Sequence, residues 1–128
     1  MRNNGPITDR EVYLGNTDEI VSSSNLRGDI EFCNTTFCRI SGYTREELVG
    51  QPHNILRHPH MPAAAFGLLW AALRAGKPWM GIVKNRCKNG DHYWVDAYIT
   101  PLRQNGQIYG YESVRVKADQ TVTQRAAA

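Results

Sequence analysis

Two Asn-Gly turns in the C-terminal third constrain the fold more than any other feature of this chain. They lie in "KNGD", residues 88–91, and in "RQNGQ", residues 103–107. Asn-Gly is a strong hairpin signal, because the tight turns that join antiparallel strands need positive φ angles. The segments around these turns, 79–88, 92–102 and 107–117, are therefore predicted to form three consecutive antiparallel strands.

A second strand pair is expected closer to the N-terminus. Residues 19–34 fit two short strands around a Gly-Asp turn at 26–29. The order is then two strands, a helical segment and three strands. This order predicts an α+β domain, with one five-stranded antiparallel sheet and short helices packed on one face.

The helical segment carries its own start and stop signals. Asn34 is a plausible N-cap for a helix at 35–41 that ends at Gly42. Thr44 and Glu47 have the spacing of a capping box. The longest helix is expected at 62–76, where one apolar stripe is formed by Phe66, Leu69, Trp70 and Leu73.

Size and composition limit the function classes. The chain has 128 residues, 41% of them hydrophobic, and a net charge of +3 without a concentrated basic run. These values predict one folded domain, at 18–118, with a flexible lead-in at 1–17 and a linker stub at 119–128. They argue against nucleic acid as a partner and against insertion of this fragment into a membrane. Without CxxC spacing, the three cysteines, Cys33, Cys38 and Cys87, are expected to be reduced thiols.

Alternation along 79–88 assigns the two faces of that strand. Met80, Ile82, Lys84 and Arg86 share one face, and the cations among them mark it as the solvent side. Asn85 then points inward, where its amide needs hydrogen-bond partners or a ligand. Trp79, Gly81 and Val83 share the inward face, and the missing side chain of Gly81 is expected to leave room for a flat ring.

The next strand extends both faces. Its more apolar set, which includes Tyr93 and Val95, is assigned to the inside. Trp94 and Tyr98 then point outward beside Met80 and form an apolar patch on the open face of the sheet, as partner surfaces commonly do.

Three histidines, His53, His58 and His60, lie within eight positions of one another. A metal site is one interpretation, but Pro59 and Pro62 stiffen the segment, and no cysteine lies nearby at ligand spacing. No metal is therefore predicted, and His60 is expected to be an exposed loop residue. We interpret the stretch as a pocket wall in which His53, Arg57 and His58 offer hydrogen bonds or charge to a ligand.

Two segments together carry a family resemblance. "NTTFCRISGYTREELVGQPHNILRHPHMP" resembles the helical half of a PAS domain, and "GIVKNRCKNGDHYWVDAYITPL" resembles its central strands. The greatest likeness is to the flavin-binding PAS domain of bacterial aerotaxis receptors. The resemblance covers 18–118.

The resemblance implies a cytoplasmic PAS sensory domain that binds FAD non-covalently, with FMN the less favoured cofactor, and that senses redox state or oxygen. It also implies a homodimer that docks on HAMP and signalling segments of a receptor anchored in the inner membrane. The candidate cofactor-binding residues are His53, Arg57, His58, Phe66, Trp79, Val83, Asn85, Tyr93, Val95, Tyr111 and Arg115.

The light-sensing flavin PAS domains, the LOV group, offer a second comparison. Their adduct-forming cysteine corresponds to His53 of this chain, whereas a pocket asparagine of that group corresponds to Asn85. A second asparagine is replaced by Val95, and a glutamine on the last strand by Arg115. A pocket of this kind without the thiol favours redox sensing over light sensing.

Two other functions stay open at this stage. A small flavin oxidoreductase is disfavoured, because the chain has no glycine-rich dinucleotide fingerprint and no evident catalytic set. A PAS module without cofactor, used for dimerisation or docking, is the other alternative. The expectation is a sensor and not an enzyme.

Overall fold

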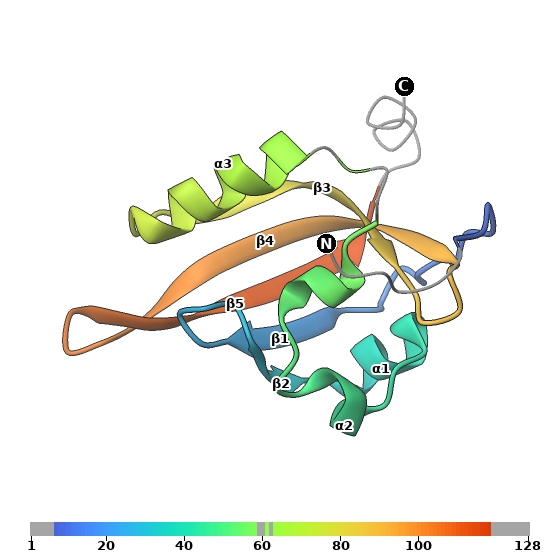
Figure 1. Ribbon diagram of the computed structural model, residues 1–128, viewed down its shortest axis with the longest axis horizontal. Coiled ribbons are helices and arrows are strands. Elements are labelled where there is room, and N and C mark those ends of the chain that lie inside the picture. The colour runs from blue at the N-terminus through green and yellow to red at the C-terminus, as the bar shows by residue number, and fades with distance from the viewer. Residues whose placement is uncertain (1–6, 59–60, 62, 119–128) are drawn as a thin grey trace.

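The computed structural model describes residues 7–58, 61 and 63–118. Five strands form one antiparallel sheet in the order β2-β1-β5-β4-β3 (Figure 1). The strands are β1 (Ile20–Ser24), β2 (Ile30–Cys33), β3 (Trp79–Arg86), β4 (His92–Gln104) and β5 (Gln107–Lys117). The predicted α+β fold is confirmed.

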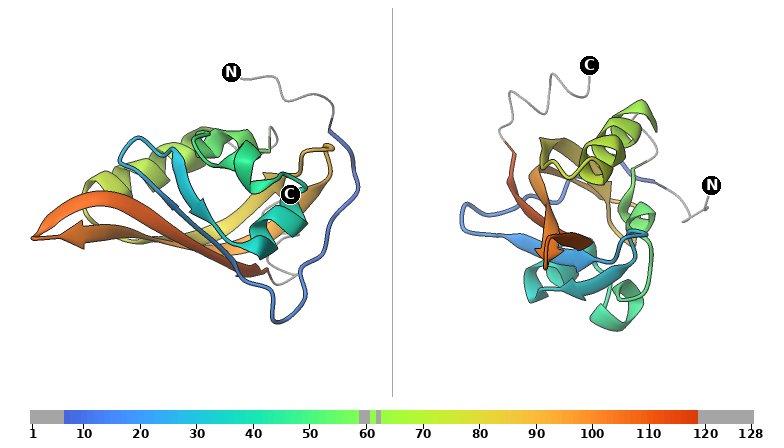
Figure 2. Two further views of the ribbon diagram at one scale, coloured as in Figure 1. Left: turned by 90° about the horizontal axis from the view of Figure 1, so that it is seen from below. Right: turned by 90° about the vertical axis from the view of Figure 1, so that its left-hand side faces the viewer.

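Four helices connect β2 to β3 and lie along one side of the curved sheet (Figure 2). They are α1 (Thr35–Ser41), α2 (Arg45–Leu48), the 3-10 helix η1 (His53–Leu56) and α3 (Ala63–Arg74). Helix α1 contacts β1, whereas η1 contacts β3, and α3 contacts β3 and β4. The helices therefore cover the inner face over most of its width.

The first two helices begin at the predicted caps. The Asn34 side chain accepts a hydrogen bond from Phe37 N, and Gly42 ends α1 in the left-handed conformation. Thr44 and Glu47 form the complete capping box of α2. These local signals are short range, so they could be identified without knowledge of the tertiary structure.

The two Asn-Gly segments form the turns that join the last three strands. Asn105 and Gly106 both have positive φ, 53° and 79°, which the right-handed twist of a two-residue hairpin requires. The register then pairs Met80 with Tyr98 and Asn85 with Tyr93 across the β3–β4 ladder. Side chains of one face are thereby aligned across neighbouring strands.

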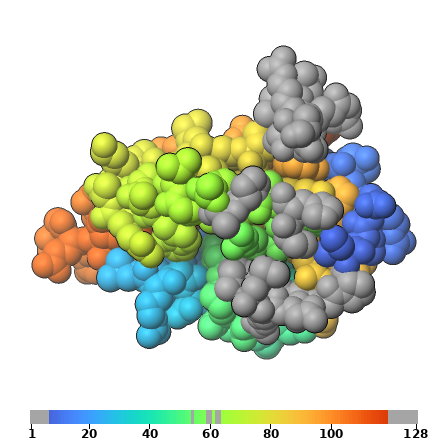
Figure 3. Space-filling view, turned by 45° about the horizontal axis from the view of Figure 1, so that its top comes forward, coloured from blue at the N-terminus to red at the C-terminus, as the bar shows by residue number. Residues whose placement is uncertain are grey.

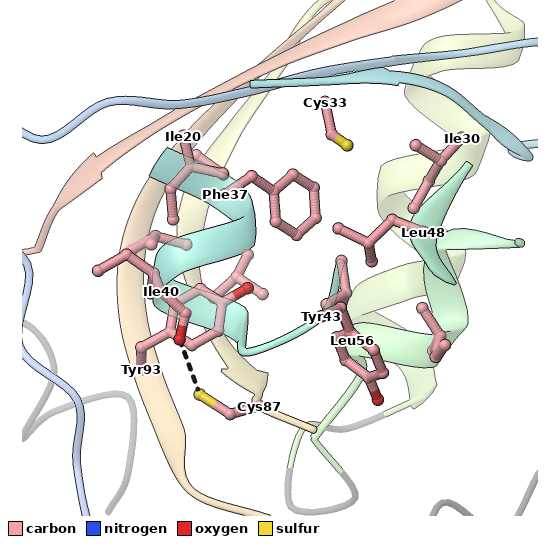
Figure 4. Packing of buried hydrophobic residues seen from close by; sticks show 14 of the residues in the cluster. Ile20, Ile30, Cys33, Phe37, Ile40, Tyr43, Leu48, Leu56, Cys87 and Tyr93 are labelled. Carbon is pink, nitrogen blue, oxygen red and sulfur yellow. Dashed lines mark hydrogen bonds between the residues drawn. The ribbon is translucent and has the colours of Figure 1, made fainter. Parts of the chain in front are cut away.

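The core forms two clusters on the inner face. The larger one joins β1, β2, β3 and β4 to α1, α2 and η1, and Phe37, Ile20 and Tyr93 are fully buried in it (Figure 4). The smaller one comprises Leu69, Leu73 and Tyr111, between α3 and β5. The space between the two clusters is where the candidate site lies.

The assignment of Arg86 to the solvent side is wrong. Arg86 does lie on the face opposite Asn85, but its exposed fraction is only 4%. The N-terminal segment passes this end of the sheet, where Thr8 N donates to Gly90 O and Val12 N donates to His92 O. Strand alternation could not indicate that this distant segment would hydrogen bond to this end of the sheet.

The same segment bears on the expected lead-in at 1–17. Residues 8–12 hydrogen bond to the β3–β4 end of the sheet, and Leu14 is buried in the core. The boundary at residue 18 stays a prediction, and the stub at 119–128 lies outside the described residues.

The rest of the outer face is open. Met80 is 69% exposed and Tyr98 45%, and Val116 lies two strands away on the same face. Trp94 differs from the expected patch because it is buried, with the Lys84 ammonium 5.7 Å from its ring. Within the described part of the chain, no helix is both long and apolar enough to cross a membrane.

Candidate functional site

A cavity of about 520 Å³ lies between the inner face of the sheet and the helices. Its walls come from η1, α3, the turn between β1 and β2, and the strands β3, β4 and β5. Figure 3 shows α3 and this turn side by side on the surface. The volume falls within the range of small-molecule and cofactor sites.

Arg115 on β5 gives the inner wall of the cavity its charge. It is only 4% exposed, and its guanidinium donates to Ser22 Oγ at 2.5 Å and lies 4.6 Å from the centre of the Phe37 ring. Its Nε has no hydrogen-bond partner among the described residues, and none of their carboxylates forms an ion pair with it. Burial lowers the pKa of Arg115 to about 10, so the group stays cationic at neutral pH. A buried cation with an unused donor suits an acceptor or an anion in the cavity.

Asn85 adds a neutral polar group to the same space. It lies on β3, is 7% exposed and lines the cavity. The amide offers both donors and an acceptor, which is unusual on an inner strand face that is otherwise apolar. Together with Arg115 it can hydrogen bond to a flat ligand with a polar edge.

His53 lies at the start of η1 and faces the cavity. Its Nε2 is buried and has no hydrogen-bond partner among the described residues. Burial and the nearby charge of Arg115 lower the pKa of His53 to about 3. The imidazole is therefore neutral at physiological pH and can act as a donor or an acceptor.

Helix α3 supplies an aromatic wall with Phe66 and Trp70. Trp70 meets Tyr111 edge to face, with 5.7 Å between ring centroids, and the Arg57 guanidinium lies 4.7 Å from the centre of the Phe66 ring. Hydrophobic and aromatic linings with few polar groups are typical of small-molecule and cofactor sites.

The cavity also has a cationic rim. Three arginines line it: Arg27 from the β1–β2 turn, Arg57 directly after η1, and Arg74 from α3. Arg27 is paired with Asp29 at 3.3 Å, but it is mostly exposed and so retains donors that face solvent. Arginines in such a position bind phosphate groups well.

Comparisons with known proteins agree with this geometry. The PAS fold family matches residues 30–115. The chain belongs to the PAS family.

Two curated relatives indicate which members of the PAS family this chain is similar to. This PAS domain is 49% identical over 112 residues to the aerotaxis receptor of Escherichia coli K12, and 30% identical over 108 residues to the nitrogen fixation regulatory protein of Klebsiella pneumoniae. The alignments cover 88% and 82% of this chain but only 22% of each relative. The chain thus spans about a fifth of their length. The resemblance to the PAS domain of aerotaxis receptors is confirmed.

Solved structures confirm the fold. A light-oxygen-voltage domain studied with a flavin analogue superposes with a TM-score of 0.74 at 22% identity, covering 84% of this chain and 81% of that one. The light state of the blue-light photoreceptor Aureochrome1 LOV gives 0.75 at 18% identity, covering 87% and 88%.

The structure brings most of the predicted site residues of this PAS domain to the cavity. Those that line it are His53, Arg57, Phe66, Val83, Asn85, Tyr111 and Arg115. Tyr93 and Val95 point inward as predicted but are fully buried in the larger core cluster, without lining the cavity. Their role at the site stays a prediction.

Two other predicted residues, His58 and Trp79, are not among those that line the cavity. His58 is buried beside His92, with 5.9 Å between the ring centroids. Trp79 packs between the two core clusters. Its ring covers Gly81 so closely that a Cβ there would lie 2.5 Å from a ring carbon. The space expected at Gly81 for a flat ring is therefore filled by the protein's own tryptophan.

Several cavity residues were not predicted as site residues. Leu69, Trp70 and Leu73 were assigned to the core from their helical stripe, and the same stripe forms one cavity wall. From the sequence, Arg27 and Gly28 could be identified only as residues of a turn. Only the position of the β1–β2 turn against α3 makes them part of the site.

The metal interpretation of the histidine stretch gains no support. Among the residues that the structure describes, no group of three or more histidine, cysteine or acidic side chains converges as metal ligands would. His60 lies outside the described residues, so its expected exposure stays a prediction.

Proposed function

We propose that this PAS domain binds a flavin in the cavity and acts as a redox sensor, with FAD as the cofactor. The observation that carries this proposal is the buried Arg115 with an unused donor, which lines a ligand-sized cavity that the aromatic side chains of α3 also line. The similarity to an aerotaxis receptor and a nitrogen fixation regulatory protein supports a sensory role. The light-oxygen-voltage neighbours support the fold.

The residues fit a flavin in three respects. The space between α3 and the sheet is flanked by the rings of Phe66, Trp70 and Tyr111, which suits a tricyclic ring. The inner wall offers unsatisfied donors for the polar ring edge. The arginine rim suits phosphate at the open end, and the two phosphates of FAD use such a rim more fully than the one phosphate of FMN.

Reduction of a bound flavin changes the charge and protonation of its polar ring edge. Asn85 can respond by rotating its amide, so that a donor replaces the acceptor. Arg115 stabilises added negative charge, and its bond to Ser22 links the cavity to β1. The signalling equilibrium shifts only by the difference in these interactions between the two redox states.

We further propose a homodimer and a receptor context. The exposed Met80, Tyr98 and Val116 form an apolar surface that is suited to a second copy or to the HAMP and signalling segments of a receptor. A parent receptor anchored in the inner membrane, with this domain in the cytoplasm, fits the similarity to the aerotaxis receptor.

Anaerobic reduction tests the sensory role and separates it from the alternatives. The purified protein with bound flavin should be reduced by dithionite and reoxidised by air, and a spin probe or fluorophore on the exposed face should report a difference between the two states. Steady consumption of NADH by the isolated domain would indicate an oxidoreductase instead. A domain that binds no flavin would indicate a docking module.

A further inference from the structure

Cys33 and Cys38 flank the beginning of α1. Asn34 is the cap, so Cys33 precedes the cap and Cys38 is the fourth helical residue. Side chains at these two positions pack together at many helix starts. Cys33 is buried in the larger core cluster (Figure 4). Cys38 is partly buried and packs against that cluster.

The two thiols also influence each other. Burial raises the pKa of the Cys33 thiol, and the adjacent Cys38 thiol raises it further through charge repulsion and hydrogen bonding. The Arg45 guanidinium lowers the pKa of Cys33, and its Nε donates to Cys33 O at 3.2 Å. The two cysteines thus lie on either side of the α1 cap, and Arg45 lies against Cys33.

We propose that Cys33 and Cys38 form a reversible disulfide when a hydroperoxide oxidises the protein. Cys38 is half-buried and open to a small oxidant, whereas Cys33 is fully buried behind it. An accessible thiol beside a protected one is the arrangement of a reacting and a resolving cysteine. This modification site does not involve the cavity, and it does not depend on a flavin.

The chemistry takes two steps. The Cys38 thiolate attacks hydrogen peroxide, so an S–O bond forms, the O–O bond breaks and water leaves after protonation. Cys33 Sγ then attacks the sulfenic acid, an S–S bond forms, and the hydroxyl leaves as water with the Cys33 proton. In total, two thiols lose two protons and two electrons, and one peroxide is reduced to two waters.

The bond would tie α1 to β2 close to Arg115. Cys33 pairs with Ser22 across the β1–β2 ladder, and Ser22 accepts the hydrogen bond from Arg115. The Cys33 thiol also acts on the Arg115 charge directly, although burial has the larger effect on the pKa of Arg115. Oxidation would thus constrain the sheet directly behind the cavity wall.

Tryptic mapping tests the proposal directly. Trypsin releases residues 28–39 as one peptide with both cysteines, and Cys87 in the separate peptide 87–88. After mild hydrogen peroxide treatment, denaturation and alkylation, peptide 28–39 should carry no alkyl group and be lighter by two hydrogens. Dithiothreitol should restore two alkylation sites. Alkylation of both cysteines after peroxide, or a Cys38 disulfide between chains, would overturn the proposal.

Two variants provide matched controls. Cys87 donates to Ile40 O at 3.3 Å, and burial raises its pKa to about 12, so it should stay reduced (Figure 4). Cys87→Ala should therefore leave the disulfide unchanged. Cys33→Ala should leave Cys38 as a sulfenic acid that dimedone labels. An unlabelled, reduced Cys38 in that variant would mean that it does not react, and would contradict the proposed order of steps.

Discussion

At the scale of single residues, Asn85 and Arg115 are the buried polar groups on which the proposed ligand binding depends. They come from β3 and β5, and both line the cavity on the inner face of the sheet. Alternation along the strands was enough to predict that Asn85 points inward. The position of Arg115 followed from the family resemblance, because its strand carries no alternation signal of comparable strength.

Replacing Asn85 by leucine should weaken flavin binding without unfolding the protein. A buried amide that hydrogen bonds to a ligand contributes about 1–3 kcal/mol, so affinity should fall roughly tenfold or more. Titration of cofactor-stripped protein with FAD, followed by flavin fluorescence, measures the change.

Arg86→Ala is not a suitable control, because Arg86 is buried. Met80→Ala lies on the same strand, on the open face, and is the better match. It should bind FAD as the unchanged protein does. If Met80→Ala loses the cofactor and Asn85→Leu keeps it, the face assignment of β3 is wrong.

The buried imidazole of His53 should make stability depend on pH. Burial lowers its pKa from 6.5 to about 3, so between these values the unfolded chain binds a proton that the folded protein does not. Its contribution to the free energy of unfolding is complete above pH 6.5 and is lost as the pH falls towards 3. One such proton corresponds to a slope of at most about 1.4 kcal/mol per pH unit.

Urea unfolding of the cofactor-stripped protein at several pH values measures this slope. His53→Gln should have a shallower slope between pH 6.5 and 4, while His92, whose pKa burial also lowers, remains in both proteins. Equal slopes in the two proteins would show that His53 takes up its proton in the folded state at the same pH as in the unfolded chain, so that its pKa is not lowered.

At the scale of elements, the close approach of the β1–β2 turn to α3 shapes the cavity. Gly28 in this turn has a φ of 91°, and an added Cβ would lie 2.9 Å from a ring carbon of Trp70. A left-handed backbone costs a residue with a side chain about 1–2 kcal/mol. Gly28→Ala should therefore lower the free energy of unfolding and also displace Trp70, so that FAD binding weakens.

Gly106→Ala separates these two effects. Gly106 has a φ of 79° in the β4–β5 turn, with open space around the position of an added Cβ. Gly106→Ala should lower the free energy of unfolding by the backbone cost alone, and its affinity for FAD should equal that of the unchanged protein. Equal FAD affinities in the two alanine variants, both measured by fluorescence titration, would mean that the turn does not shape the cavity.

The elements themselves were largely predictable from the sequence. The caps at Asn34 and Thr44, the apolar stripe of α3 and both Asn-Gly turns are local signals, and each element formed where its signal lies. Contacts between distant segments could not be predicted in this way. Arg86 is buried at the end of the sheet where the N-terminal segment hydrogen bonds, and the position of Trp79 over Gly81 depends on side-chain packing that alternation does not describe.

At the scale of the whole molecule, the thiols lie apart from the cavity. Cys33, Cys38 and Cys87 are absent from its lining, and His53 lines it where the resemblance to LOV domains would place the reactive cysteine. Blue light should therefore produce no thiol adduct that absorbs in the near ultraviolet. Difference spectra after illumination measure this, and an adduct that disappears in Cys38→Ala or Cys87→Ala would contradict the arrangement.

The central claim is that the cavity between α3 and the sheet binds FAD. The visible spectrum of the purified protein, followed by heat release and chromatography of the cofactor, tests it most directly. We predict the bands of oxidised flavin, bound non-covalently and released as FAD. A protein that stays colourless after incubation with both FAD and FMN would contradict the claim.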